Sequence, residues 1–90
     1  MKTISIKVTN ENGLTSRLAA ELVAEANKHI SRCTMVADRN DPSKQADLKS
    51  IMNVFTLAFP KGGHFDIDIE GVDEESAYHS FFDLIQSLPL

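Results

Sequence analysis

The chain has 90 residues, 42% of them hydrophobic and 24% charged, with a formal net charge of −4 at pH 7. This length predicts a single domain spanning residues 1–90, because it is too short for a second core. The acidic balance argues against a nucleic-acid partner, since the Lys and Arg residues are scattered and form no basic cluster that could displace counterions.

The first half of the chain predicts a strand, a helix and two shorter strands. Polar and apolar residues alternate over residues 3–9, which is typical of a strand with one buried face. Residues 16–29 predict an amphipathic helix capped by Thr15 or Ser16, with Glu21, Glu25 and Lys28 on its polar face. The apolar face of this helix comprises Leu18, Ala19, Leu22, Val23, Ala26 and Ile30. Strands are expected at residues 33–37 and 44–48, on either side of turn residues 38–43.

The second half predicts a short helix, a strand and a final helix. Ser50 is expected to cap a helix over residues 51–57, which the Pro and Gly residues of segment 60–63 end. Residues 64–70 alternate most regularly and predict a strand, with Asp66, Asp68 and Glu70 on a solvated face. Asp73 is expected to cap the last helix. The buried stripe of this helix comprises Ala77, Tyr78, Phe81, Leu84, Ile85 and Leu88.

These elements predict an α+β fold with the order βαββαβα. Strands with one polar and one apolar face are typical of an antiparallel sheet with helices on one side and water on the other. The apolar strand residues should face the helices, in particular Leu22, Phe81 and Ile85. The strand residues of this group are Ile4, Ile6, Val8, Phe65, Ile67 and Ile69.

Three segments carry a family resemblance. They read GLTSRLA at 13–19, LKSIMNV at 48–54 and IEGVDEE at 69–75. Together they resemble the HPr family, the histidine-containing phosphocarriers of the sugar phosphotransferase system. The corresponding family patterns are G-L/I/M-H-A-R-P-A, L/V-K-S-I-M-G-V/L, and a strand that ends in glycine before an acidic helix start. The resemblance covers nearly the whole chain and implies the HPr-like open-faced sandwich, a four-stranded antiparallel sheet covered on one face by three helices.

The first segment departs from the family pattern at its chemical centre. Thr15 occupies the position of the phosphorylated histidine, so the chain is most similar to the histidine-lacking type called catabolite-repression HPr, or Crh. A threonine hydroxyl has a very high pKa and no general base near it in the sequence, which predicts a helix cap rather than a phosphoryl acceptor. Ser16 and Arg17 remain as candidate anion-binding residues at the helix start. Arg17 is equally compatible with a solvated surface charge.

Ser50 is the candidate modification site. The resemblance implies phosphorylation of this serine by HPr kinase/phosphorylase, whereas the alternative is an unmodified N-cap serine. The neighbouring Ile51, Met52 and Phe55 have helical spacing, which is compatible either with core packing or with an exposed docking patch. In the family, the matching positions dock enzyme I, the kinase and a transcription repressor. The candidate partner-binding residues are Arg17, Lys49, Ile51, Met52 and Phe55. Asn53 replaces the family's glycine.

The remaining polar residues predict no metal site or cofactor. His29, His64 and His79 lack metal-ligand spacing and are expected at the surface, and Cys33 is expected to be buried. The single cysteine, and the absence of a long apolar run or a signal-peptide core, favour a cytoplasmic location with no membrane partner.

The sequence therefore predicts a non-enzymatic, HPr-like regulatory protein controlled by serine phosphorylation. Its expected partners are HPr kinase/phosphorylase and a catabolite-control transcription regulator. Two alternatives remain open. One is a phosphocarrier with an unusual acceptor, and the other is a stand-alone binding module that retains only the fold.

Overall fold

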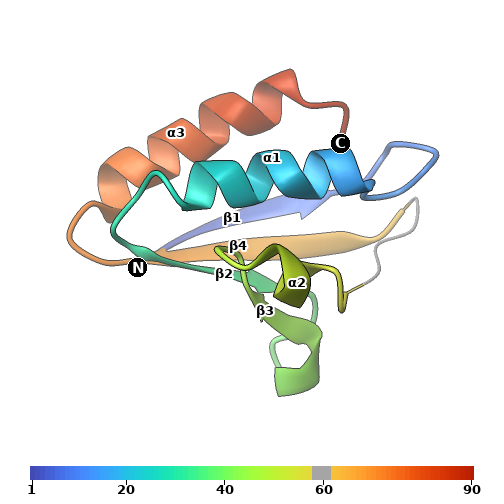
Figure 1. Cartoon of the computed structure of the whole chain (residues 1–90), viewed down its shortest axis with the longest axis horizontal. Coiled ribbons are helices and arrows are strands. Elements are labelled where there is room, and N and C mark those ends of the chain that lie inside the picture. The colour runs from blue at the N-terminus through green and yellow to red at the C-terminus, as the bar shows by residue number, and fades with distance from the viewer. Residues whose placement is uncertain (58–61) are drawn as a thin grey trace.

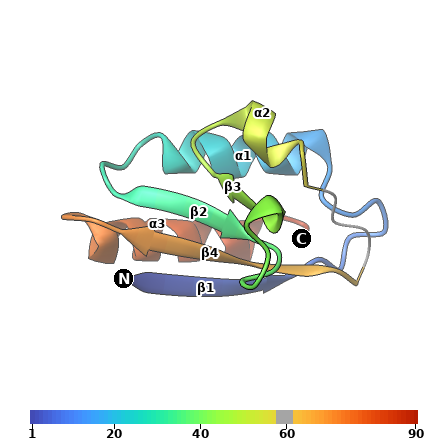
Figure 2. The ribbon, with the colours of Figure 1, turned by 90° about the horizontal axis from the view of Figure 1, so that it is seen from below.

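The strands form an antiparallel sheet with the order β1-β4-β2-β3, seen in a computed structural model that describes residues 1–57 and 62–90. Within those residues the elements follow the predicted βαββαβα order. Helices α1 and α3 lie across one face of the sheet, and α2 packs beside α1 and β3 (Figure 1). The opposite face of the sheet is turned to the viewer in Figure 2, with the helices behind it. The bounds are β1 (Lys2–Lys7), α1 (Ser16–Ala26), β2 (Arg32–Val36), β3 (Gln45–Asp47), α2 (Ile51–Val54), β4 (His64–Glu70) and α3 (Glu74–Ser87), with a 3-10 turn at Pro42–Lys44.

The core lies between the sheet and the helices, in the predicted register. Ile4 pairs with Ile67 and Ile6 pairs with Phe65 across β1 and β4, so their side chains share the helix-covered face. Phe65, Ile67, Leu22 and Phe81 are essentially inaccessible to solvent. The alternation of β1 and β4 therefore buries one face of each strand, as predicted. Tyr78, Leu84, Ile85 and Leu88 of the α3 stripe are only partly buried, although they pack against the core.

Helix α1 ends at Ala26, three residues earlier than predicted. The amide side chain of Asn27 donates to the Val23 carbonyl at 2.9 Å, and the chain then turns toward α3. The sequence pattern predicts Ile30 on the apolar face of the helix, but this residue lies in the following turn and is 79% exposed. Glu25, predicted on the polar face, is instead buried, and its carboxylate pairs with His29 and Lys28.

Asp73 stands at the start of α3, but its side chain makes no cap hydrogen bond there. Its carboxylate instead accepts from the backbone N–H groups of Ile30 at 3.0 Å and Ser31 at 2.9 Å, and from the Ser31 hydroxyl. The predicted cap is therefore a bridge between α3 and the segment that enters β2. Gly71 makes this approach possible, because a Cβ atom there would lie 2.6 Å from Ser31 Oγ and 2.7 Å from Ser31 Cα.

The short elements differ from the predictions in their ends. The turn predicted at residues 38–43 runs into the 3-10 turn, so β3 begins at Gln45. Helix α2 is four residues long and is followed by looser turns, in which Thr56 and Leu57 donate to carbonyls three residues back. Part of the predicted break at residues 60–63 lies outside the described residues. Gly62, at φ 89°, donates to the Val8 carbonyl at 2.8 Å.

Candidate functional site

The first candidate site lies at the start of α1. Gly13 adopts φ 71°, a left-handed conformation that favours glycine, and this turn leads the chain into the helix. Thr15 is the N-cap, because its Oγ1 accepts a hydrogen bond from Leu18 N at 3.3 Å. The prediction that Thr15 or Ser16 caps the helix is thus confirmed for Thr15. Ser16 and Arg17 follow in the first turn with exposed side chains.

The surroundings of Thr15 do not activate its hydroxyl. No hydrogen bond among residues 1–57 and 62–90 joins a carboxylate or an imidazole to this side chain. A hollow of about 280 Å³ adjoins it, lined by Asn10, Thr15, Arg17, Leu18, Ser87, Leu88 and Pro89. The sequence pattern does not predict that residues 87–89 line this hollow. Their signal was weak, because only Pro89 after the α3 stripe marks a change of direction.

The second candidate site is Ser50, at the start of α2. Its side-chain oxygen accepts from the backbone N–H of Asn53 at 3.3 Å and from the Asn53 side-chain amide at 3.1 Å. Ser50 is half-buried rather than enclosed, and it heads α2 as predicted. Asn53, the one departure in this segment from the family pattern, therefore gives the serine an additional hydrogen-bond donor.

Exposed apolar side chains lie next to Ser50. Met52 is 73% exposed and Phe55 52% exposed, whereas Val54 on the other side of the turn is buried. We call Met52 and Phe55 the α2 patch. Ile51 is partly buried and packs against the core, so it is not part of the α2 patch.

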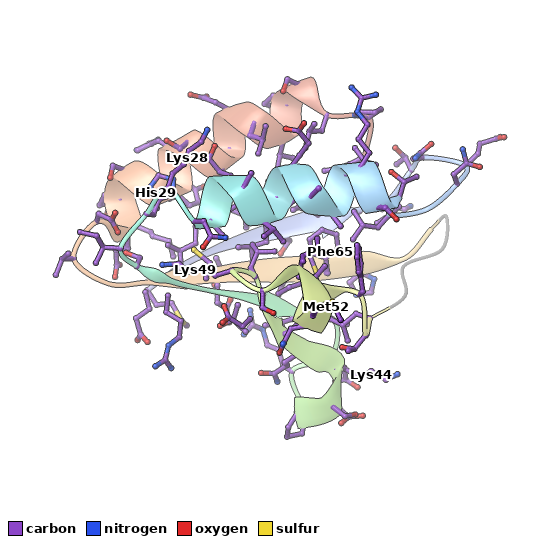
Figure 3. The ribbon with its side chains drawn as sticks, in the orientation of Figure 1. Lys28, His29, Lys44, Lys49, Met52 and Phe65 are labelled. Carbon is purple, nitrogen blue, oxygen red and sulfur yellow. The ribbon has the colours of Figure 1, made fainter. Side chains whose placement is uncertain are left out.

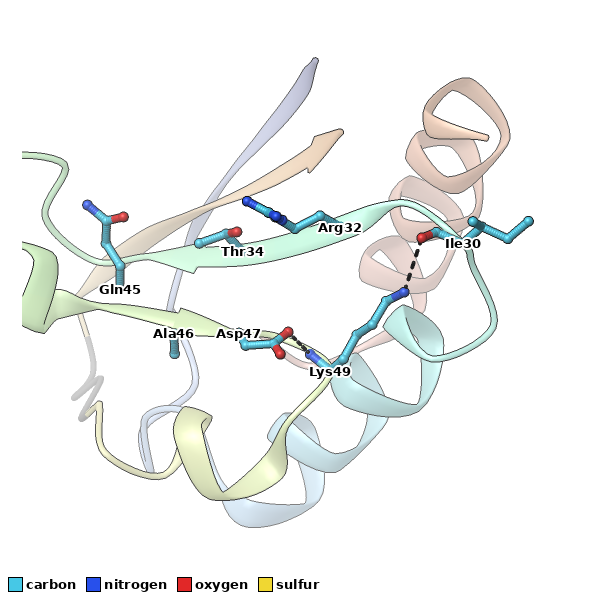
Figure 4. A pocket seen from close by; sticks show the side chains of 7 residues that line it. All are labelled: Ile30, Arg32, Thr34, Gln45, Ala46, Asp47 and Lys49. Carbon is cyan, nitrogen blue, oxygen red and sulfur yellow. Dashed lines mark hydrogen bonds between the residues drawn. The ribbon is translucent and has the colours of Figure 1, made fainter. Parts of the chain in front are cut away.

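Lys49 does not join this patch, as Figure 3 shows for Lys49 and Met52. Its ammonium group donates to the carbonyl of His29 at 2.7 Å and to that of Ile30 at 3.4 Å. Figure 4 shows the side chain extending to Ile30 along a hollow of about 730 Å³. The hollow is lined by Ile30, Arg32, Thr34, Gln45, Ala46, Asp47 and Lys49.

His29 is not the surface residue that the sequence suggested. Its side chain is 11% exposed, and Nε2 lies 2.6 Å from a carboxylate oxygen of Glu25. Its ring centroid is 6.1 Å from that of Phe81, and Nδ1 is 3.8 Å from Asp73. Bonds from the Ser31 hydroxyl and the Ile30 N–H lower the pKa of Asp73 to about 2. His64 and His79 are exposed, as predicted.

The aspartates of β4 are paired rather than simply solvated. The guanidinium of Arg39, from the loop after β2, donates to Asp68 at 2.7 and 2.8 Å and to Asp66 at 3.0 Å. These bonds lower the pKa of Asp68 and raise that of Arg39. Thr3 also donates to Asp68. The sequence predicts a solvated face here, and it does not predict Arg39 as the partner of these aspartates because nothing local in the sequence marks that residue.

Cys33 is buried, as predicted, and burial raises the pKa of its thiol to about 11. Within residues 1–57 and 62–90, no three His, Cys, Asp or Glu side chains gather as metal ligands do. Over the same residues, no helix has the length and apolar character needed to cross a membrane.

Comparisons with known proteins agree with this geometry. The family described as PTS HPr component phosphorylation site matches residues 2–87. Phosphocarrier protein HPr of Lysinibacillus sphaericus is 33% identical over 90 residues, which cover all of this chain and 98% of the relative. The crystal structure of HPr-C-His from Thermoanaerobacter tengcongensis superposes with a TM-score of 0.80 at 34% identity, covering 97% of this chain and 93% of that one.

A further structural neighbour is the Bacillus subtilis catabolite-repression protein Crh. It superposes with a TM-score of 0.66 at 29% identity, covering 100% of this chain and 99% of that one. Proteins of the matched family are phosphocarriers rather than enzymes, and they interact with components of the phosphotransferase system. The fold, the three sequence segments and these matches together show that the chain belongs to the HPr family.

Proposed function

We propose that this protein is a regulatory member of the HPr family, controlled by phosphorylation of Ser50 rather than by phosphoryl transfer at the start of α1. Its proposed partners are HPr kinase/phosphorylase and a transcription regulator of carbon catabolite control, in the cytoplasm. The observation that carries the proposal is the partly exposed Ser50 at the start of α2, next to the exposed Met52 and Phe55. The whole chain, residues 1–90, would act as one module.

Thr15 is a poor phosphoryl carrier for two physical reasons. Its hydroxyl is the N-cap acceptor of Leu18 N, and no base among the described residues is bonded to it. A phosphothreonine ester is also too stable to donate its phosphoryl group readily, unlike the phosphoramidate formed on an imidazole. The position therefore supports a structural cap rather than a carrier.

Ser50 presents a hydroxyl to which a phosphate could be added without unfolding α2. The backbone N–H and the side-chain amide of Asn53 already point at its oxygen and would remain as donors to a phosphate. Helix α2 has only four residues, so these local donors matter more than a helix dipole. The modification would add about two negative charges beside the α2 patch.

The α2 patch supplies a surface on which a partner could dock in either charge state. An exposed Met and Phe offer adaptable apolar contacts, and the adjoining Val54 anchors the turn in the core. Phosphorylation would then change partners through local charge beside a fixed apolar surface.

Incubation with HPr kinase/phosphorylase and ATP, followed by intact-mass and peptide mass spectrometry, tests the proposal. We expect one added phosphate on the native chain, lost in Ser50→Ala and retained in the matched control Ser16→Ala, which removes an exposed serine from the start of α1. An unmodified native chain would contradict the regulatory function and favour a binding module that retains only the fold. Acid-labile label from enzyme I and phosphoenolpyruvate would instead favour the phosphocarrier alternative.

A further inference from the structure

The segment that carries Ser50 is tied to the end of α1 by hydrogen bonds in both directions. The Asn27 amide, just beyond α1, donates to the backbone carbonyl of Lys49 at 3.1 Å. The Lys49 ammonium donates in return to the carbonyl of His29 at 2.7 Å. We call these two contacts the Asn27–Lys49 clasp. The clasp therefore restrains both the backbone and the side chain of Lys49, the residue immediately before Ser50.

The turn that accepts the Lys49 ammonium is itself held in place by contacts with α1 and α3. His29 is held by the buried carboxylate of Glu25 at 2.6 Å, and its ring lies against Phe81 of α3. The next two residues, Ile30 and Ser31, donate their backbone N–H groups to Asp73 at the start of α3. The carbonyls of His29 and Ile30 are therefore fixed acceptors for the ammonium of Lys49.

On its other side, the Ser50 segment is anchored at Leu48, which is buried in the core and donates its backbone N–H to the Cys33 carbonyl at 2.9 Å. Between Leu48 and α2 the regular structure is short, since β3 has three residues and α2 has four. The local bonds are those of the Asp47 turn, in which Lys49 N donates to Asp47 Oδ1 at 2.9 Å and Ser50 N donates to the Asp47 carbonyl at 3.0 Å. Figure 4 shows Lys49 reaching from this turn to the segment before β2.

We infer that Lys49 is a positioning residue for the modification of Ser50, acting through the clasp rather than by touching the kinase. The inference rests on the proposed function. A nucleophile that is already held in place reacts faster once bound, whereas docking strength depends on the contact surface. Loss of the clasp should therefore lower kcat for phosphorylation and leave KM nearly unchanged. Loss of Met52 from the α2 patch should raise KM.

The experiment compares Lys49→Met with Lys44→Met, which removes the same charge from an exposed position in the 3-10 turn. We expect kcat to fall about tenfold in Lys49→Met, with less than about a twofold change in KM. Lys44→Met should match the native chain, and Lys49→Arg should recover part of the loss because a guanidinium also donates to carbonyls. Equal kcat values for Lys49→Met and the native chain would overturn the positioning role.

Asn27→Ala separates positioning from direct recognition, because it opens the clasp without changing a charge. A kcat decrease in the same direction as in Lys49→Met supports the clasp. A normal kcat in Asn27→Ala, with a raised KM in Lys49→Met, would overturn it in favour of direct contact between the kinase and Lys49.

Amide hydrogen exchange over residues 48–53 gives a readout that needs no kinase. Exchange should be faster in Lys49→Met and Asn27→Ala than in Lys44→Met, while exchange in β4 stays unchanged. Unaltered exchange would overturn the clasp itself. Absence of phosphorylation on the native chain, by contrast, would overturn the proposed function, so the two failures are distinguishable.

Discussion

Thr15 stands where the family pattern has a histidine, and the two side chains differ in what they do at a helix start. The threonine hydroxyl closes the first turn by accepting from Leu18 N. An imidazole would instead offer a nitrogen that is nucleophilic near neutral pH. Ser16 and Leu18 also depart from the family pattern, whereas Arg17 matches it, is exposed and adjoins the hollow at the start of α1.

Thr15→His, alone or with Leu18→Pro, should restore phosphoryl acceptance from enzyme I and phosphoenolpyruvate. Proline is tolerated in the first helical turn, and the Leu18 N–H that it removes loses its acceptor when Thr15 is replaced. The measurement is acid-labile label on the protein, with Thr15→Ala as the unlabelled control. If Thr15→His folds normally by circular dichroism and stays unlabelled, the surrounding site has also lost its ability to support transfer.

One helix start in this protein is bonded to a distant segment of the chain. The start of α3 is joined to the start of β2 through Asp73, whose pKa the Ser31 hydroxyl and the Ile30 N–H lower to about 2. An aspartate with a lowered pKa stabilises the fold above its unfolded-state value near 4, and this contribution is lost as the pH falls toward 2.

Asp73→Asn should therefore lower the melting temperature at pH 7, and the difference from the native chain should narrow between pH 4 and pH 2. The neutral amide cannot replace the carboxylate as an acceptor for three donors, but it also has no charge to lose in acid. Thermal unfolding followed by circular dichroism at several pH values checks this. Asp83→Asn, an exposed position on α3, is the control and should follow the native curve.

The contrast between local and distant interactions also explains which elements could be predicted from the sequence. Alternation in β1 and β4 and the caps at Thr15 and Ser50 depend on neighbouring residues, and these predictions are confirmed. The burial of Glu25 and the early end of α1 depend on His29 and on Asp73, which periodicity does not bring together. The ion pairs of Arg39 and the direction of Lys49 likewise depend on the tertiary fold.

For the molecule as a whole, stability depends on the layer between the sheet and the helices. Strand β4 lies inside the sheet, paired with β1 on one side and β2 on the other. Its apolar face is fully covered by the helix-side core, in which Ile67 is completely buried.

Ile67→Ala should lower the free energy of unfolding by about 2–5 kcal/mol, because it leaves a cavity at the centre of the sheet. Chemical denaturation gives the value. Val72→Ala is the matched control, since Val72 is 88% exposed and its truncation should cost little. A small loss in Ile67→Ala would mean that the layer relaxes around the deletion more readily than its burial suggests.

The close approach of Gly71 to Ser31 restricts which residue types evolution can accept at these two positions. Any side chain at position 71 would place a carbon atom within 3.0 Å of Ser31, so only glycine fits while the two segments remain in contact. Ser31 is itself almost completely buried, which leaves room there for a small side chain only. We therefore expect natural variants to retain glycine at 71 and Ser, Ala or Gly at 31. A lineage that replaced either residue would have to separate the two turns and give up the bridge through Asp73.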